Sequence, residues 1–297
     1  MTARAAGQRE ASTPHGIIVR KIPFAFDEGI EPIWNPAQPE WSHMVNGASL
    51  TMPYLEPFLI RTMREAMALV DDPGLKEDAR GFIGQEGQHF QNHRRYNEML
   101  KARGYPELAE VEDEMEADYI RFQKKSLRWR LAYTAGFETM TVGLTEWLIT
   151  NRRAFFADAD PSVTSLVLWH MVEETEHKTA AFDLYQAAFG DYWPRVWGVF
   201  CGSLHVIKCS RKAYILMLER DGRWRNGRSR LRVWRRAADM LWNVGKVLVG
   251  SMMPGHHPSR VSDPAWVRQW ADAYAGLPEN HIPLLDTRDP EIPARFA

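Results

Sequence analysis

The chain has 297 residues, of which 45% are hydrophobic and 25% are charged, and its formal net charge is −1. This composition is typical of a soluble globular protein with a sizeable core, and it excludes wholesale disorder. The balanced charge gives no reason to expect binding to nucleic acid.

The N-terminal 40 residues differ from the rest of the chain. The first 16, "MTARAAGQREASTPHG", lack the apolar core of a secretory signal, and prolines recur from residue 23 to residue 39. One short strand candidate, "GIIVRKIPFAF", is weakened by Pro23. We therefore expect residues 1–40 to be a disordered tail and an irregular arm, and residues 41–297 to form a single helical domain.

Helical spacing of apolar residues dominates the remainder of the chain. The predicted helices span residues 53–70, 76–103, 106–125, 127–157, 162–188, 193–219, 232–253 and 264–275. Pro57 should lie in the first turn of its helix, where its missing N–H costs little. The strongly basic stretch 220–236 is interpreted as a solvated loop between two helices. The fold class predicted is all-α.

The two cysteines, Cys201 and Cys209, lie eight residues apart in one predicted helix. Eight residues span about 12 Å of helix, which is too far for a disulfide. A reducing, cytoplasmic setting is therefore expected.

Two copies of one short motif carry the chemistry. Glu86 and His89 form the first Glu-x-x-His, and Glu174 and His177 form the second. In a helix this spacing places both side chains of a pair on one face. A single copy is weak evidence for a metal site, because charged helix surfaces produce the pattern by chance.

Two isolated acidic residues strengthen the evidence for a metal site. Glu56 ("MPYLEPFLI") and Glu138 ("AYTAGFETMTVGL") lie in otherwise apolar helices, where a carboxylate is costly unless it is paired or binds a cation. The order Glu, Glu-x-x-His, Glu, Glu-x-x-His is used by ferritin-like four-helix bundles to hold two metal ions. We therefore predict such a bundle, with additional C-terminal helices and the irregular N-terminal arm.

Three neighbouring residues leave alternatives open. His93 lies on the stripe of Glu86 and His89, and is either a further ligand or a hydrogen-bonding neighbour. His170 lies on the stripe of His177, and a hydrogen-bonding role is favoured for it. Glu173 is an alternative ligand to Glu174, which the i, i+3 spacing favours.

Longer blocks of sequence resemble a known family. "NGASLTMPYLEPFLIRTMRE", "GFIGQEGQHFQNHRRYNEML", "GFETMT", "LWHMVEETEHKTAAFDLY" and "PGHHPS" are similar to the predicted metal-dependent hydrolases, a bacterial family of the ferritin-like superfamily. By matching position, the resemblance implies six metal-site residues: Glu56, Glu86, His89, Glu138, Glu174 and His177. Pro57 departs from the family pattern, which carries a charged residue there.

Several functions fit a dinuclear carboxylate and histidine centre. The leading hypothesis is a di-iron oxidase or oxygenase that activates O₂ against a small organic substrate, the usual chemistry of the superfamily. The alternative is a hydrolase with a metal-activated water, as the family name implies, and metal storage is third. The donors suit two iron ions, with manganese or a mixed pair as alternatives. A homodimer is expected, and peripheral membrane contact is an alternative that we do not favour.

Overall fold

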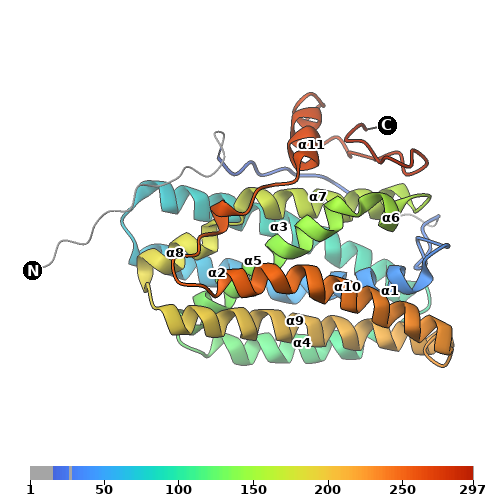
Figure 1. Ribbon diagram of the computed structural model, residues 1–297, viewed down its shortest axis with the longest axis horizontal. Coiled ribbons are helices and arrows are strands. Elements are labelled where there is room, and N and C mark those ends of the chain that lie inside the picture. The colour runs from blue at the N-terminus through green and yellow to red at the C-terminus, as the bar shows by residue number, and fades with distance from the viewer. Residues whose placement is uncertain (1–15, 27–28, 297) are drawn as a thin grey trace, which may run out of the picture.

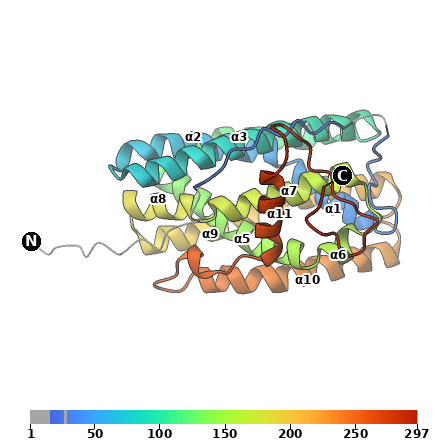
Figure 2. The same ribbon diagram turned by 90° about the horizontal axis from the view of Figure 1, so that it is seen from above.

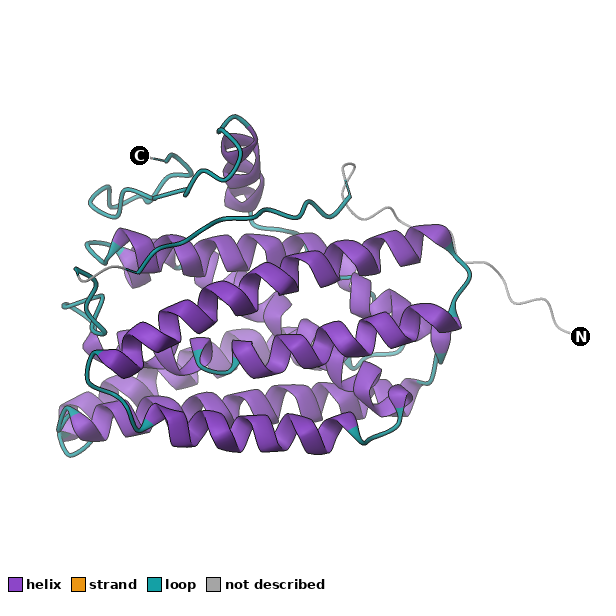
Figure 3. Ribbon diagram, turned by 180° about the vertical axis from the view of Figure 1, so that it is seen from behind, coloured by secondary structure: helices purple, strands orange, loops and turns teal. Residues whose placement is uncertain are grey.

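The computed structural model describes residues 16–26 and 29–296, and this part of the chain is all-α, as predicted (Figure 1). Its only β-type pairing is an isolated bridge between Leu285 and Phe296, and Figure 3 accordingly draws no strand there. The helices are α1 Pro39–Ser49, α2 Met52–Ala66, α3 Pro73–Ala102, α4 Leu108–Gln123, α5 Leu127–Thr150, α6 Arg152–Phe156, α7 Pro161–His177, α8 Ala180–Ala188, α9 Tyr192–Arg220, α10 Gly227–Ser251 and α11 Ala265–Ala275. Short 3₁₀ turns occupy Met67–Leu69 and Pro258–Arg260.

Local sequence signals begin and end the long helices. The side chains of Asp72, Ser126 and Asp160 accept hydrogen bonds from backbone N–H groups in the first turns of α3, α5 and α7. Such caps satisfy donors that have no partner within the helix. After α3 and α8 the chain turns at Gly104 and Gly190, whose φ angles are +117° and +69°. Glycine adopts this left-handed region without the steric cost of a side chain.

Four long helices contact one another in a closed ring, α2 with α3, α3 with α7, α7 with α5, and α5 with α2. α4 follows α3 and precedes α5 along the chain, and it contacts α2 and α9. Two further long helices, α9 and α10, pack on α5, and α1 packs on α9 (Figure 1). α11 lies outside the long helices (Figure 1) and contacts α7, over which it is seen in Figure 2. The interior of the ring is therefore enclosed by helices on all sides.

α5 and α9 cross with their backbones in direct contact. A Cβ placed on Gly136 would lie 2.2 Å from the carbonyl group of Gly198. A Cβ on Gly198 would lie 2.0 Å from the carbonyl oxygen of Ala132. Only glycine allows the two helices to approach this closely.

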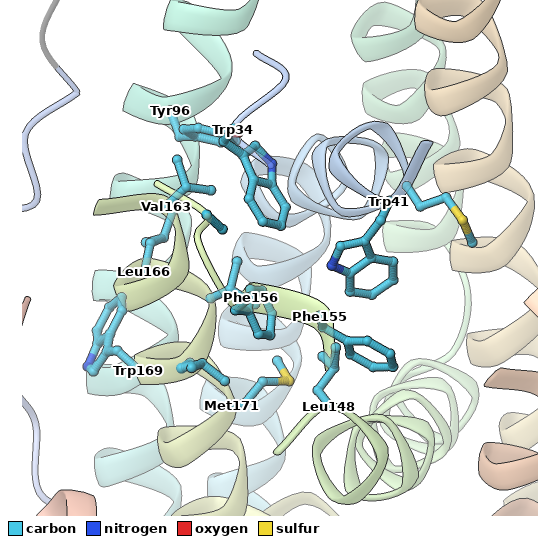
Figure 4. Packing of buried hydrophobic residues seen from close by; sticks show 14 of the residues in the cluster. Trp34, Trp41, Tyr96, Leu148, Phe155, Phe156, Val163, Leu166, Trp169 and Met171 are labelled. Atoms are coloured by element: carbon cyan, nitrogen blue, oxygen red, sulfur yellow. The ribbon is translucent and has the colours of Figure 1, made fainter. Parts of the chain in front are cut away.

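An aromatic cluster fastens the N-terminal arm and α1 to one end of the ring (Figure 4). Trp34 of the arm stacks on Phe156 with ring centroids 5.8 Å apart, and Trp41 of α1 lies 4.9 Å from Phe155. The indole N–H of Trp34 donates to the Asn46 side chain. These contacts explain why α6, only five residues long, is well anchored.

Pro57 does not lie in the first turn, so that prediction is wrong. α2 begins at Met52, which places Pro57 inside the helix. The proline has no N–H for the carbonyl of Pro53, and Arg94 of α3 donates to this oxygen at 3.4 Å instead. A tertiary contact thus replaces the lost helical hydrogen bond.

Three other boundaries differ from the prediction. The expected helix 127–157 is interrupted at Asn151, and 162–188 is interrupted directly after His177. The basic stretch is not a loop beyond residue 226, because Asn226 caps α10 and arginines continue along its first turns. α1 was not predicted; its buried Glu40 pairs with Arg232 of α10 at 2.9 Å, a long-range contact that sequence spacing cannot show.

Residues 1–15 of the 16-residue stretch predicted to be a disordered tail lie outside the described part of the chain. None of the described helices is long and apolar enough to cross a membrane. The outward faces of α9 and α10 expose several large apolar side chains, among them Trp193, Trp197 and Trp242. The expected homodimer stays a prediction.

Candidate metal centre

Seven ionisable side chains converge inside the ring of four helices, and all are buried. Each of the four helices contributes at least one. They are Glu56 of α2, Glu86 and His89 of α3, Glu138 of α5, and His170, Glu174 and His177 of α7. The six residues predicted as metal ligands are thus brought together, with His170 added to them.

The first of two sets surrounds the imidazole of His177. Its Nε2 lies 3.3 Å from a carboxylate oxygen of each of Glu86, Glu138 and Glu174. One ligand atom from each of these four residues falls within 4.8 Å of the others. This spacing suits a single cation between them.

The second set joins Glu56, His89 and His170, whose ligand atoms also fall within 4.8 Å of one another. Nε2 of His170 lies 3.7 Å from Glu56 and 2.8 Å from Glu174. The rings of His89 and His170 have centroids 4.1 Å apart.

Two glutamates reach both sets. One oxygen of Glu86 lies 3.3 Å from His177, and the other lies 3.9 Å from Nδ1 of His89. Glu174 is arranged in the same way, 3.3 Å from His177 and 3.8 Å from His89. Carboxylates placed between two sets of donors can bridge two neighbouring cations.

Many of the nitrogen and oxygen atoms that could bind a metal at this centre have no hydrogen-bond partner among the described residues. These are both oxygens of Glu56, Glu86 and Glu138, one oxygen of Glu174, Nδ1 of His89 and Nε2 of His177. Buried polar atoms are almost always paired, and an unpaired buried carboxylate is costly. Bound cations would satisfy these atoms together, so the side chains fit a metal centre.

The carboxylates repel one another when no metal is present. Burial, together with the charges of neighbouring glutamates, raises the pKa of Glu56 and Glu86 well above the usual range, and raises the pKa of Glu138 to about 7. Burial also acts to raise the pKa of Glu174, but the charges and hydrogen bonds of His177 and His170 together outweigh it and leave this pKa lowered. Protons on the glutamates therefore take the place of cations in the metal-free protein.

Outer hydrogen bonds orient two of the histidines. Nε2 of His89 lies 2.9 Å from Glu173, and Nδ1 of His177 lies 3.0 Å from the side-chain oxygen of Gln85. These contacts leave Nδ1 of His89 and Nε2 of His177 facing the glutamates. Such partners fix the ring orientation and tautomer of metal-binding histidines. Glu173 thus lies behind a histidine rather than in the place of Glu174.

His93 has neither nitrogen directed at the two sets. The Ser49 hydroxyl donates to Asn97, so it accepts from Nδ1 of His93 at 2.8 Å. Nε2 of His93 lies 2.8 Å from Nδ1 of His170. Nε2 of His170 faces the centre, 2.8 Å from Glu174. His170 therefore lies in the second set, although the sequence favours a hydrogen-bonding role for it, and His93 lies behind it, which is one of the two alternatives left open for His93.

Arg20 of the N-terminal arm was not predicted as part of the site. Its guanidinium donates to Glu173 at 3.0 Å and to Glu176 at 2.6 and 2.8 Å. Gln85 also donates to Glu176, at 2.7 Å. Through these bonds the outer partners of His89 and His177 are joined. A single arginine in an irregular segment carries no sequence signal for this role.

A cavity of about 750 Å³ lies on the outer side of Arg20 and its partner Glu176. Arg20 and Glu176 line it, together with Ile18, Thr175 and residues of α11 such as Arg268. Since Arg20 also contacts Glu173, which contacts His89, one layer of side chains separates the cavity from the centre.

No curated protein and no solved structure matches the chain significantly. One family model does, over residues 18–262, and its description is predicted metal-dependent hydrolase. The match covers Arg20 and every residue of the candidate centre. The chain therefore belongs to the family of predicted metal-dependent hydrolases.

Proposed function

We propose that the protein is a hydrolase that holds two metal ions in its ring of helices. The observation that carries the proposal is the group of buried carboxylate and imidazole atoms without hydrogen-bond partners among the described residues. Two of the glutamates in this group, Glu86 and Glu174, face both sets of possible ligands. The family description favours hydrolysis over the O₂-dependent reaction, which no comparison supports.

The donor set suits iron or manganese. It contains oxygen and nitrogen atoms and no sulfur, and mixed carboxylate and imidazole sites favour these metals over structural zinc. We propose iron as the first choice, with manganese or a mixed pair as alternatives. When bound, the two ions would lower the pKa of a water molecule and so supply a nucleophile near neutral pH.

The side chains around the centre would hold the histidine ligands in a fixed orientation. Each imidazole packs against one aromatic ring, His177 against Phe82 and His89 against Trp169, with ring centroids 4.7 and 4.9 Å apart. Glu173 and Gln85 hold the outer nitrogens of these histidines. Burial raises the pKa of Glu173 to about 8, so this carboxyl is suited to hold or release a proton near neutral pH.

The cavity beside Arg20 is our proposed substrate site. It is large enough for a small organic molecule, and Arg20 offers a planar donor group for a carboxylate, ester or phosphate oxygen. Engagement of Arg20 by substrate would compete with its bonds to Glu173 and Glu176, and would thereby open the layer between cavity and centre.

We also propose that the ring of α2, α3, α5 and α7 is a ferritin-like bundle. Its order of ligands along the chain and the placing of α4 between the second and third helices are those expected of that topology. The same likeness supports a second candidate function, an O₂-dependent oxidase, because ferritin-like proteins commonly use such a donor set for it.

One experiment separates the two functions. Protein loaded with Zn²⁺, Mn²⁺ or Fe²⁺ is assayed under argon against aryl esters, anilides and phosphodiesters, and the Fe²⁺ form is then exposed to O₂ in an oxygen electrode. Hydrolysis in the absence of O₂ would support the hydrolase if the activity is lost in Glu86→Gln and kept in a control variant. The control is Glu146→Gln, because Glu146 is an exposed residue of α5. O₂ uptake without any hydrolysis would favour the oxidase instead.

A further inference from the structure

A second group of metal-binding side chains lies between α4 and α9, outside the ring of four helices. Asp118 comes from α4, and His205 and Cys209 come from α9, one helical turn apart. Oδ2 of Asp118 lies 3.1 Å from Nε2 of His205, and Sγ of Cys209 lies 3.6 Å from the same nitrogen. All three ligand atoms fall within 4.8 Å of one another.

The spacing of these atoms suits a small tetrahedral cation. A zinc ion with bonds of about 2.0–2.3 Å places neighbouring ligand atoms roughly 3.3–3.7 Å apart. The two distances to Nε2 are close to this range, with the longer one involving sulfur, as its longer metal bond requires.

His205 is held in the orientation that such a site needs. The hydroxyl of Tyr133 lies 2.8 Å from Nδ1 of His205 and 3.2 Å from the hydroxyl of Tyr119. The rings of Tyr119 and Phe122 pack on the imidazole, with centroids 5.2 and 4.8 Å away. Nδ1 is therefore occupied on the buried side, and Nε2 faces Asp118 and Cys209. Outer partners of this kind are characteristic of histidine ligands.

We propose that Asp118, His205 and Cys209 bind one thiophilic divalent cation of the Zn²⁺ class, with a fourth position open to water. The proposal does not rest on the hydrolase function. Carboxylate, imidazole and thiolate together are ligands that zinc and cobalt accept, whereas the central donor set has no sulfur. The bound ion would link α4, the helix between the second and third members of the ring, to α9.

The metal-free site keeps its thiol protonated. Burial, together with the neighbouring Asp118, raises the pKa of Cys209 to about 11. Burial also lowers the pKa of His205, so its imidazole is neutral and available as a ligand. Arg121 pairs with the other oxygen of Asp118, which leaves Oδ2 facing the site.

Co²⁺ titration of the reduced full-length protein tests the proposal, because a cobalt–thiolate bond gives a charge-transfer absorption in the near ultraviolet. We expect this band in the wild type, its loss in Cys209→Ser and His205→Ala, and its retention in Cys201→Ser. The band should also persist in the double variant Glu86→Gln, His177→Ala, which separates this site from the central one. Absence of the band in the wild type, or its persistence in Cys209→Ser, would overturn the proposal.

A second measurement needs no variant. Zn²⁺ should slow the reaction of the Cys209 thiol with a disulfide reagent at least tenfold, with the labelled cysteine identified by peptide mass. Cys201, which also lies on α9 and is partly exposed, serves as the internal control. Equal labelling of Cys209 with and without Zn²⁺ would count against the site.

Discussion

Nε2 of His89 lies 2.9 Å from one oxygen of Glu173, and the other oxygen of Glu173 lies 3.0 Å from Arg20. The first contact turns Nδ1 of His89 toward Glu86 and Glu174. Through the second contact, the N-terminal arm is linked by Glu173 to the same histidine. Orientation of a candidate metal ligand thus depends on a residue more than 60 positions away along the chain.

Replacing this carboxylate should weaken metal binding without abolishing it. Glu173→Gln keeps an oxygen that accepts from His89 but removes the charge that the carboxyl carries above its pKa of about 8 and that makes the imidazole a stronger ligand. At pH 9 we therefore expect metal affinity to fall by roughly 10–100-fold. Competition with a chromophoric chelator measures this change. Glu77→Gln, at an exposed position of α3, is the control and should leave affinity unchanged. Equal affinities for the two variants would contradict the role given to Glu173.

Glu56 should show a trade-off between metal binding and stability. Both of its oxygens lack hydrogen-bond partners among the described residues, and burial together with the charges of Glu86 and Glu174 raises its pKa well above the usual range. Glu56→Gln removes a buried acid that must otherwise stay protonated. At pH 8 we therefore expect a higher Tm for the metal-free variant than for the metal-free wild type, and weaker metal binding. A lower Tm for the variant would show that the carboxylate stabilises the fold in another way.

The metal-free protein should lose stability as the pH rises above 6.5. Burial raises the pKa of Glu138 to about 7 and that of Glu173 to about 8, so the folded state holds protons that the unfolded chain has already released. Stability falls with pH wherever the folded state binds more protons. Burial lowers the pKa of His89 and His93, which favours the opposite trend, but only below pH 6.5, because above it these histidines are neutral in both states.

Thermal unfolding at pH 6.5, 7.2 and 8.0, with chelator and with added metal, measures this dependence. We expect Tm to decrease across the series in chelator. With metal bound the decrease should be smaller, because cations replace the protons on the glutamates. A Tm that rises with pH in chelator would contradict the raised pKa values.

The sequence grouped the residues of the candidate centre more successfully than it predicted their surroundings. Glu86, His89, Glu174 and His177 could be grouped because the Glu-x-x-His spacing is a local property of a helix. Glu138 could be added because a lone acid in an apolar helix demands a partner. His170 could not be assigned, because its role depends on the hydrogen-bond chain through His93 to Ser49, which joins three separate helices.

The same distinction explains the errors in the fold. Helix existence follows from apolar spacing, and nearly every long predicted segment is helical. The position of Pro57 inside α2 depends on Arg94 of another helix, and α1 depends on aromatic contacts with α6. Long-range contacts of this kind leave no periodic trace in the sequence.

The crossing of α5 and α9 should be the most sensitive glycine contact in the protein. In Gly136→Ala the new methyl group would lie 2.2 Å from backbone atoms of Gly198, which cannot move aside as a flexible side chain could. We expect the free energy of unfolding to fall by about 2–3 kcal/mol, the upper range for overpacking in a core. Because Glu138 is two residues away on α5, displacement of this helix should also weaken metal binding.

Gly245→Ala in α10 is the matched control, since nothing lies within 4 Å of its Cβ, and it should stabilise the protein by about 0.5–1 kcal/mol. Urea unfolding followed by circular dichroism measures both values, and destabilisation of both variants to the same extent would show that helix contact is not the cause.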